Sequence, residues 1–157
     1  MRARAIAAAV VAIVAVAGCG EDKPTKAEYI AQVDRICKRA KPAERRLSRE
    51  FAGIRQAGGA RAKRRRLQST LDEAVRTETD ILNEVKAVER PEGAAGEQAQ
   101  RFIRSNEQDI AILRRLSSAL KQNSAPAFTQ ALQQISARRG TTKGIAQGYG
   151  FKVCGSG

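Results

Sequence analysis

Four polar side chains occupy positions where the helical pattern of this 157-residue chain calls for apolar residues. Each lies four or seven residues from apolar residues of its own helix, and therefore on the same helical face. Counted from the predicted helix ends, all four lie within about two turns of one another. The sequence therefore predicts an interior polar layer made of Glu44, Glu78, Asn106 and Arg139.

Two carboxylates and a guanidinium in such a layer could bind a metal ion, form an ion network or contact a small ligand. Carboxylates at bundle-core positions are typical of di-iron proteins, but that site needs Glu-x-x-His pairs and the chain contains no His. A carboxylate on an apolar face cannot stay charged without a partner, so we expect Arg139, or its neighbour Arg138, to pair with one of them. The favoured interpretation is a buried ion network, with a small-ligand site as the alternative.

The absence of His also removes most classes of enzyme. Without it the chain lacks the usual acid/base group near neutral pH and the commonest nitrogen ligand of zinc and haem iron. Ser-His-Asp and Cys-His sites are excluded, and no motif supports catalysis by carboxylates or Lys. We therefore expect no enzymatic activity, no metal and no cofactor.

The first nineteen residues have the features of an export signal. A short cationic start precedes an apolar run over 5–17, which is too short for a comfortable membrane span and matches the hydrophobic region of a signal peptide. The run ends in Val-Ala-Gly-Cys at 16–19, which resembles the lipobox of bacterial lipoproteins. The alternative is an ordinary signal peptide that happens to contain a cysteine.

In the lipoprotein family the cysteine of this motif receives fatty acyl groups, and the peptidase cuts just before it. The resemblance therefore implies a signal peptide over 1–18, lipidation of Cys19, a tether over 19–25 and a domain over 26–157. It also implies a location on the extracytoplasmic face of a bacterial membrane, with membrane lipid as a partner through the acyl anchor. The mature chain is loosely similar to small helical lipoproteins of high-GC bacteria, through its early Tyr-Ile…Ile-Cys and closing Tyr-Gly-Phe…Val-Cys segments; this likeness implies no activity.

The domain is predicted to be helical throughout, because apolar residues recur every three or four positions and no run alternates as a strand would. A capping box of Thr25 and Glu28 starts the first helix near Lys26. Its apolar phase continues past Pro42 as far as Gly58-Gly59, so we expect one kinked helix or two nearly collinear pieces.

Three further helices are predicted, ending near Arg90, at Asn123 and beyond Ala146. Ser124 is the expected N-cap of the last helix, which its glycines weaken by up to about 1 kcal/mol each. Because the joints are short, the fold class is predicted to be an all-α, up-down-up-down four-helix bundle.

If Cys19 carries lipid, Cys37 and Cys154 remain, one near each end of the domain. In an oxidising compartment two such thiols usually pair, and free buried thiols are the alternative. Cys37 and Ala146 lie at similar depths along the first and last helices, so the final residues can return Cys154 to Cys37. The predicted disulfide stabilises the fold by roughly 3–5 kcal/mol in the chain-entropy model.

The chain has a net charge of +13, of which Arg2 and Arg4 belong to the predicted signal peptide. Cations at a helix N-terminus oppose the macrodipole, and an anionic partner would offset that cost. An anionic envelope polymer, a facing membrane or an acidic protein fits this charge, whereas export argues against nucleic acid. The alternative is a solvated basic face. The densest basic run consists of Arg61, Lys63, Arg64, Arg65 and Arg66.

These patterns predict a membrane-anchored extracytoplasmic lipoprotein that acts as a binding or structural module of the cell envelope. The alternative function is an extracytoplasmic small-ligand-binding bundle that uses the interior polar layer. A well-formed pocket beside Glu78 and Arg139 would favour the ligand binder, and tight packing there would favour the interaction module.

Overall fold

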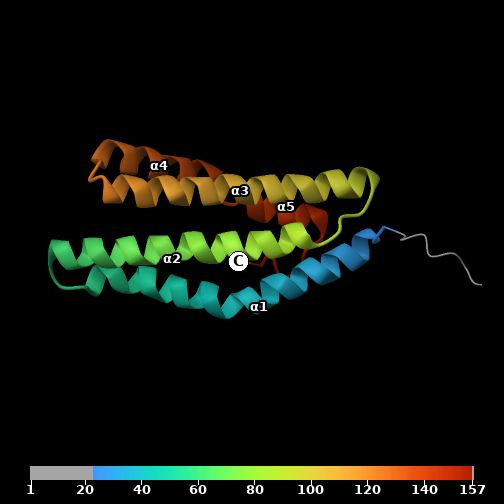
Figure 1. The fold of residues 1–157 in the computed structure, drawn as a ribbon, viewed down its shortest axis with the longest axis horizontal. Helices are drawn as coiled ribbons and strands as arrows, with labels where there is room; N and C mark the ends of the chain where they lie inside the picture. The colour runs from blue at the N-terminus through green and yellow to red at the C-terminus, as the bar shows by residue number, and fades with distance from the viewer. Residues whose placement is uncertain (1–22, 157) are drawn as a thin grey trace, which may run out of the picture.

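The computed structural model describes residues 23–156, and all regular structure in that range is helical (Figure 1). Helices α1 (Lys26–Gly53) and α2 (Gly59–Ala87) are antiparallel and joined through a short 3-10 turn, η1 (Ile54–Gln56). Helix α3 (Gly93–Lys121) returns beside α2, and α4 (Ala125–Arg138) followed by α5 (Thr141–Tyr149) runs back along α3. The fold is an all-α four-helix bundle whose fourth position is shared by two shorter helices.

The first helix follows its local sequence signals closely. The Thr25 N–H donates to Glu28 Oε2 at 2.8 Å and the Glu28 N–H to Thr25 Oγ1 at 3.3 Å, which forms the predicted capping box. Pro42 lies inside α1, and the helix bends near its middle, as Figure 1 shows. The predicted kinked helix is confirmed, but it ends at Gly53 and not at Gly58-Gly59, because η1 makes the turn into α2.

The predicted single fourth helix is wrong in one respect. Gly140 has φ +81°, in the left-handed region that favours glycine, and it separates α4 from α5. The chain then resumes a helix over Thr141–Tyr149. Ser124 caps α4 as predicted, since its side chain accepts the Ala127 N–H.

The apolar side chains form two clusters, one in each half of the bundle. We call the half that contains residue 23 the proximal half and the opposite half, with the α1–α2 and α3–α4 turns, the distal half (Figure 1). The proximal cluster is rich in aromatic rings, with Tyr29 and Tyr149 packed edge to face at 6.0 Å and Phe102 4.8 Å from Phe151. The distal cluster is aliphatic at its centre, around Leu71, Ile112, Leu116 and Ala131.

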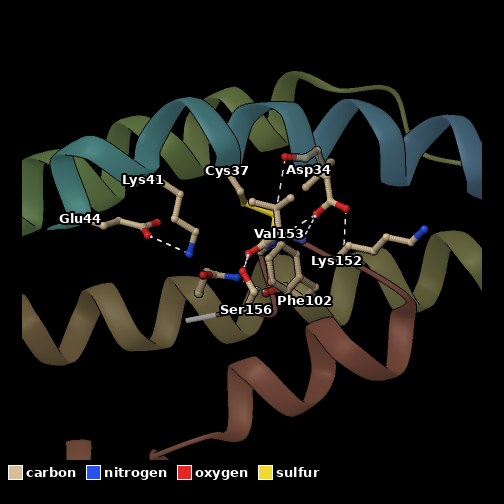
Figure 2. Close-up of a disulfide and its surroundings, with 11 residues drawn as sticks. Asp34, Cys37, Lys41, Glu44, Phe102, Lys152, Val153 and Ser156 are labelled. Atoms are coloured by element: carbon tan, nitrogen blue, oxygen red, sulfur yellow. Dashed lines mark hydrogen bonds and ion pairs between the residues drawn. A yellow bond between two sulfur atoms is a disulfide. The ribbon is translucent and has the colours of Figure 1, made fainter.

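The disulfide that the cysteine count predicted joins Cys37 to Cys154, with their Cα atoms 5.3 Å apart. Asp34, one turn before Cys37, holds the same tail: its carboxylate accepts the backbone N–H groups of Lys152 and Val153 at 2.9 Å and that of Cys154 at 3.2 Å. Figure 2 shows these bonds on one side of the disulfide. The C-terminal tail is therefore fixed against α1 by one covalent bond and three hydrogen bonds.

The lipobox at 16–19, including Cys19, and most of the predicted tether lie outside the described residues. Among the helices of residues 23–156, none combines the length and apolar character that crossing a membrane requires. The two candidate functional regions that follow both lie within the described bundle.

Candidate functional site

A cavity of about 140 Å³ lies beside the disulfide, where α1, α2, α3, α5 and the tail converge. It is smaller than a typical drug-binding pocket of roughly 300–1,000 Å³ but close to the ~150 Å³ that holds one benzene molecule. Three of the four residues predicted for the interior polar layer line it. The lining consists of Cys37, Glu44, Glu78, Ile81, Leu82, Val85, Phe102, Asn106, Thr142 and Cys154.

Glu78 on α2 is the ionisable group of this cavity that lacks a partner. Within residues 23–156, no hydrogen bond or ion pair reaches its carboxylate. Burial raises the pKa of Glu78 above its usual value, and the charges of Glu44 and Asp109 raise it further. The side chain is only partly exposed, so water does not fully replace the missing partner.

The other two predicted residues present acceptors to the cavity. Glu44 Oε2 lies 3.2 Å from Lys41 Nζ, and Figure 2 shows this pair farther along α1 than the disulfide. Asn106 donates through Nδ2 to the Phe102 carbonyl at 2.8 Å, within its own helix. The carboxamide oxygen of Asn106 therefore keeps its capacity to accept a hydrogen bond.

The prediction that Arg139 belongs to this layer is wrong. Arg139 is exposed and lies at the C-terminal end of α4, where the backbone leaves the helix. The prediction counted seven residues on from Leu132, which is itself 46% exposed. The face of α4 that packs on α3 runs through Phe128, Ala131, Ile135 and Arg138.

Arg138 does point inward, but it binds a different carboxylate from the two predicted. Its Nε donates to Asp109 Oδ1 at 2.6 Å, and its Nη2 donates to Ser105 Oγ at 2.9 Å. The hydroxyl of Thr142 also donates to Asp109, and Ser105 Oγ lies 2.6 Å from Thr142 Oγ1. These bonds join α3, α4 and α5 and direct Nε and Nη2 of Arg138 to Asp109 and Ser105, so Glu78 is left without the predicted cation.

The sequence analysis did not identify Asp109 and Ser105, because it searched only for polar residues that interrupt an apolar stripe. A signal was present: Asp109 follows Ser105 by four residues, so the two polar side chains share one face of α3.

In the part of the chain that the structure describes, no group of three or more Asp, Glu or Cys side chains is placed to hold a metal ion.

The basic run lies at the other end of the bundle and is not uniform. Arg61, Lys63 and Arg65 are exposed, and no described residue pairs with them. Arg64 has a structural contact: its Nη1 donates to Asn123 Oδ1 at 2.5 Å and its Nη2 to the Leu120 carbonyl at 2.6 Å. We call the five residues Arg61, Lys63, Arg64, Arg65 and Arg66 the cationic tip.

The fifth member, Arg66, lies against α1. A Cβ at Gly53 would come within 3.3 Å of Arg66 Nη2, so this glycine leaves room for the guanidinium. Of the five cations predicted as one patch, Arg64 is bonded to the end of α3, Arg66 lies beside α1, and the other three are available to a partner.

The segment of sequence that contains the cationic tip has no acidic residue. The sequence contains no Asp or Glu over 51–71 or after Asp109. The sequence prediction considered the basic run and did not consider this absence of acidic residues. Helix α2 begins with no side-chain cap and no acidic residue in its first turn. The macrodipole and the neighbouring like charges therefore both disfavour this arrangement.

The fold and these sites define a disulfide-bonded, all-α four-helix bundle with an acceptor-lined cavity in its proximal half and a cationic tip at its distal end. No family model, curated protein or solved structure shows a significant match to the chain.

Proposed function

We propose that this chain is a lipid-anchored extracytoplasmic lipoprotein of a bacterial membrane, and that its cationic tip binds an anionic polymer of the cell envelope. The observation that supports the proposal is the location of three unpaired cations at the end of the bundle farthest from residue 23 (Figure 1). The proposed anchor, Cys19, precedes residue 23 by only four positions. The anchored domain thus presents its most cationic end away from the anchor.

Distance separates the tip from the membrane that would hold the anchor. Helix α2 has 29 residues, which is about 43 Å at 1.5 Å per residue. Exposed charges act over a Debye length of about 8 Å at physiological salt, so an upright bundle's tip would not sense its own membrane. The partner is therefore a polymer that reaches the tip from the wall or the facing side of the envelope.

The energetics of α2 support a binding role for these cations. An uncapped helix start that carries like charges is less stable than one with an acidic first turn, by roughly 0.3–1 kcal/mol for each charge near the macrodipole. A bound polyanion would reverse the sign of this interaction. The proposal therefore predicts stabilisation of the bundle by the same polymer that binds it.

The binding test compares two triple variants of equal net charge, each in the full chain purified in a nonionic detergent. In the tip variant, Arg61, Lys63 and Arg65 become Gln; in the control, Lys38, Arg101 and Arg104, which are exposed in the proximal half, become Gln. With polyphosphate as the probe, we expect the tip variant to lose at least fivefold in affinity and the control less than twofold. Equal losses would show that net charge alone drives binding and would contradict the proposal.

The anchor is tested separately. Cys19→Ala should abolish incorporation of labelled fatty acid and leave an unprocessed precursor in cells. Unchanged labelling in this variant would contradict the lipoprotein assignment without affecting the test of the cationic tip.

A further inference from the structure

We propose that the cavity beside Glu78 binds a small organic cation, namely a primary ammonium group on an apolar body, with about six heavy atoms in all. This proposal does not depend on the anchor or on the cationic tip. It assigns a ligand class to a cavity that the envelope-binding function leaves unused.

The polar groups that line the cavity indicate that the ligand carries a positive charge. Glu44 and Glu78 present carboxylates and Asn106 presents a carbonyl oxygen, and all of these are acceptors. Two nearby donors are already engaged: Lys41 pairs with Glu44, and the Thr142 hydroxyl donates to Asp109. An anion placed here would meet the like charges of Glu44 and Glu78, and only the second N–H of Asn106 would remain to donate to it. An ammonium group would meet two carboxylates and the Asn106 carbonyl oxygen.

The ammonium group also matches the acceptors in number. It carries three N–H donors, and the cavity offers three side chains that can accept them: Glu44, Glu78 and Asn106. Of these, Glu78 has no bond or ion pair within residues 23–156 that the ligand would have to displace. Glu78 is therefore the residue on which we expect affinity to depend most.

The apolar residues that line the rest of the cavity indicate that the remainder of the ligand is apolar. Ile81, Leu82, Val85 and Phe102 line the cavity together with the Cys37–Cys154 bridge, and none of these side chains offers a strong hydrogen-bonding group. A bare metal ion would leave this apolar surface unused, whereas a short alkyl chain would cover it. At about 140 Å³ the cavity holds n-butylammonium, with five heavy atoms, but not a long polyamine.

The cavity also has a route to solvent. Glu44 lines the cavity and pairs with Lys41, and the side chains of Glu44 and Lys41 remain 34% and 24% exposed. Both are long side chains on one helix, so rotation of this pair would admit a small ligand without moving the backbone. The disulfide, whose tail Asp34 holds, forms another part of the cavity wall.

The test uses isothermal titration calorimetry of the full chain in nonionic detergent at pH 7. The probes are n-butylammonium, the similar-sized neutral n-butanol and the anion butyrate. We expect n-butylammonium to bind, butyrate not to bind, and n-butanol to bind at least tenfold more weakly than the amine. Equal binding of amine and alcohol, or no binding of the amine up to 100 mM, would overturn the proposal and leave a cavity that holds water.

Matched variants then locate the site. Glu78→Gln removes the unpartnered carboxylate, and Asp72→Asn removes a partnered carboxylate from the same helix. We expect Glu78→Gln to raise the Kd for n-butylammonium at least tenfold and Asp72→Asn to change it less than twofold. Glu44→Gln provides a second variant at the cavity, with an expected loss of about threefold. Identical affinity in wild type, Glu78→Gln and Glu44→Gln would place the bound amine elsewhere and overturn the assignment.

Discussion

Two carboxylates on α2, six residues apart, have opposite surroundings. Asp72, in the distal half, accepts hydrogen bonds from Ser117 Oγ at 2.5 Å and Gln68 Nε2 at 3.0 Å, and its Oδ1 lies 3.0 Å from Lys121 Nζ. Burial raises the pKa of Asp72, but these donors outweigh that effect and hold the pKa below its usual value. Glu78, in the proximal half, has no donor among the described residues, and its pKa is raised.

Asp72 therefore serves the structure, whereas the Glu78 carboxylate remains available to a ligand. A bundle that needed only stability would supply Glu78 with a donor or replace it by an apolar residue of similar size. The nearby Arg138 has the right chemistry, but it is committed to Asp109 and Ser105. The proximal half therefore keeps a cavity and an unmatched acid, while the distal half satisfies its interior acid and keeps its unmatched charges on the surface.

The largest effect should come from removing the disulfide that borders the cavity. Replacing both Cys37 and Cys154 by Ala should lower the free energy of unfolding by roughly 3–5 kcal/mol, because the loop they close spans 117 residues. Amide hydrogen exchange should rise mainly in α1 and in residues 150–156 of the proximal half. The comparison of the two halves would fail if exchange rose equally around Leu71 and Leu116 in the distal cluster.

Arg138 and Arg139 provide the next test. Arg138→Ala should destabilise the bundle by about 1–3 kcal/mol in chemical denaturation, because it leaves the half-buried Asp109 with the Thr142 hydroxyl but without its cation. Arg139→Ala should change stability by less than about 0.5 kcal/mol, since Arg139 is exposed. A larger loss of stability for Arg139→Ala than for Arg138→Ala would show that Arg139 is the interior residue and would contradict the helix boundary at Gly140.

The two carboxylates of α2 should give pH effects of opposite sign. Since the pKa of Asp72 is lowered by folding, its contribution to stability is present at neutral pH and is lost as the pH falls through its pKa. Asp72→Asn should therefore cost about 1 kcal/mol at pH 7 and little in acid. Denaturation curves at pH 7 and pH 3 measure the difference.

The raised pKa of Glu78 reverses this dependence. Its ionised form disfavours the folded state, so the bundle loses stability from Glu78 as the pH rises from its usual value through its raised one. Glu78→Gln should therefore stabilise the protein at pH 7, with the gain disappearing below the usual carboxyl pKa. Destabilisation at pH 7 would show that Glu78 has a partner in solution.

Local signals in the sequence were sufficient for much of the fold. The Thr25–Glu28 capping box and the Ser124 cap depend on neighbours three residues away, and the Cys37–Cys154 bridge followed from there being no other pair once Cys19 was set aside. Glu44, Glu78 and Asn106 were found as polar interruptions of apolar stripes, and the structure places all three around one cavity.

The failures have a common physical cause. The count of seven residues from Leu132 predicted that Arg139 is buried. In the structure α4 packs on α3 through the adjacent face, which contains Ala131 and Arg138. The local sequence does not determine which of these two neighbouring faces packs on α3. The partners of Asp34 are backbone N–H groups more than a hundred residues away, which no spacing on α1 could reveal. Sequence periodicity thus located the polar residues but not their pairing.

Carbon-detected NMR titration of the Asp72 and Glu78 carboxyl groups in one sample tests the central contrast most directly. We expect the pKa of Asp72 to lie below 3.8 and that of Glu78 above 4.5, and we expect saturating n-butylammonium to lower the pKa of Glu78 alone. A Glu78 pKa at or below 4.5 without the amine would contradict an unpartnered, half-buried carboxylate, and with it the cavity on which the ligand assignment depends.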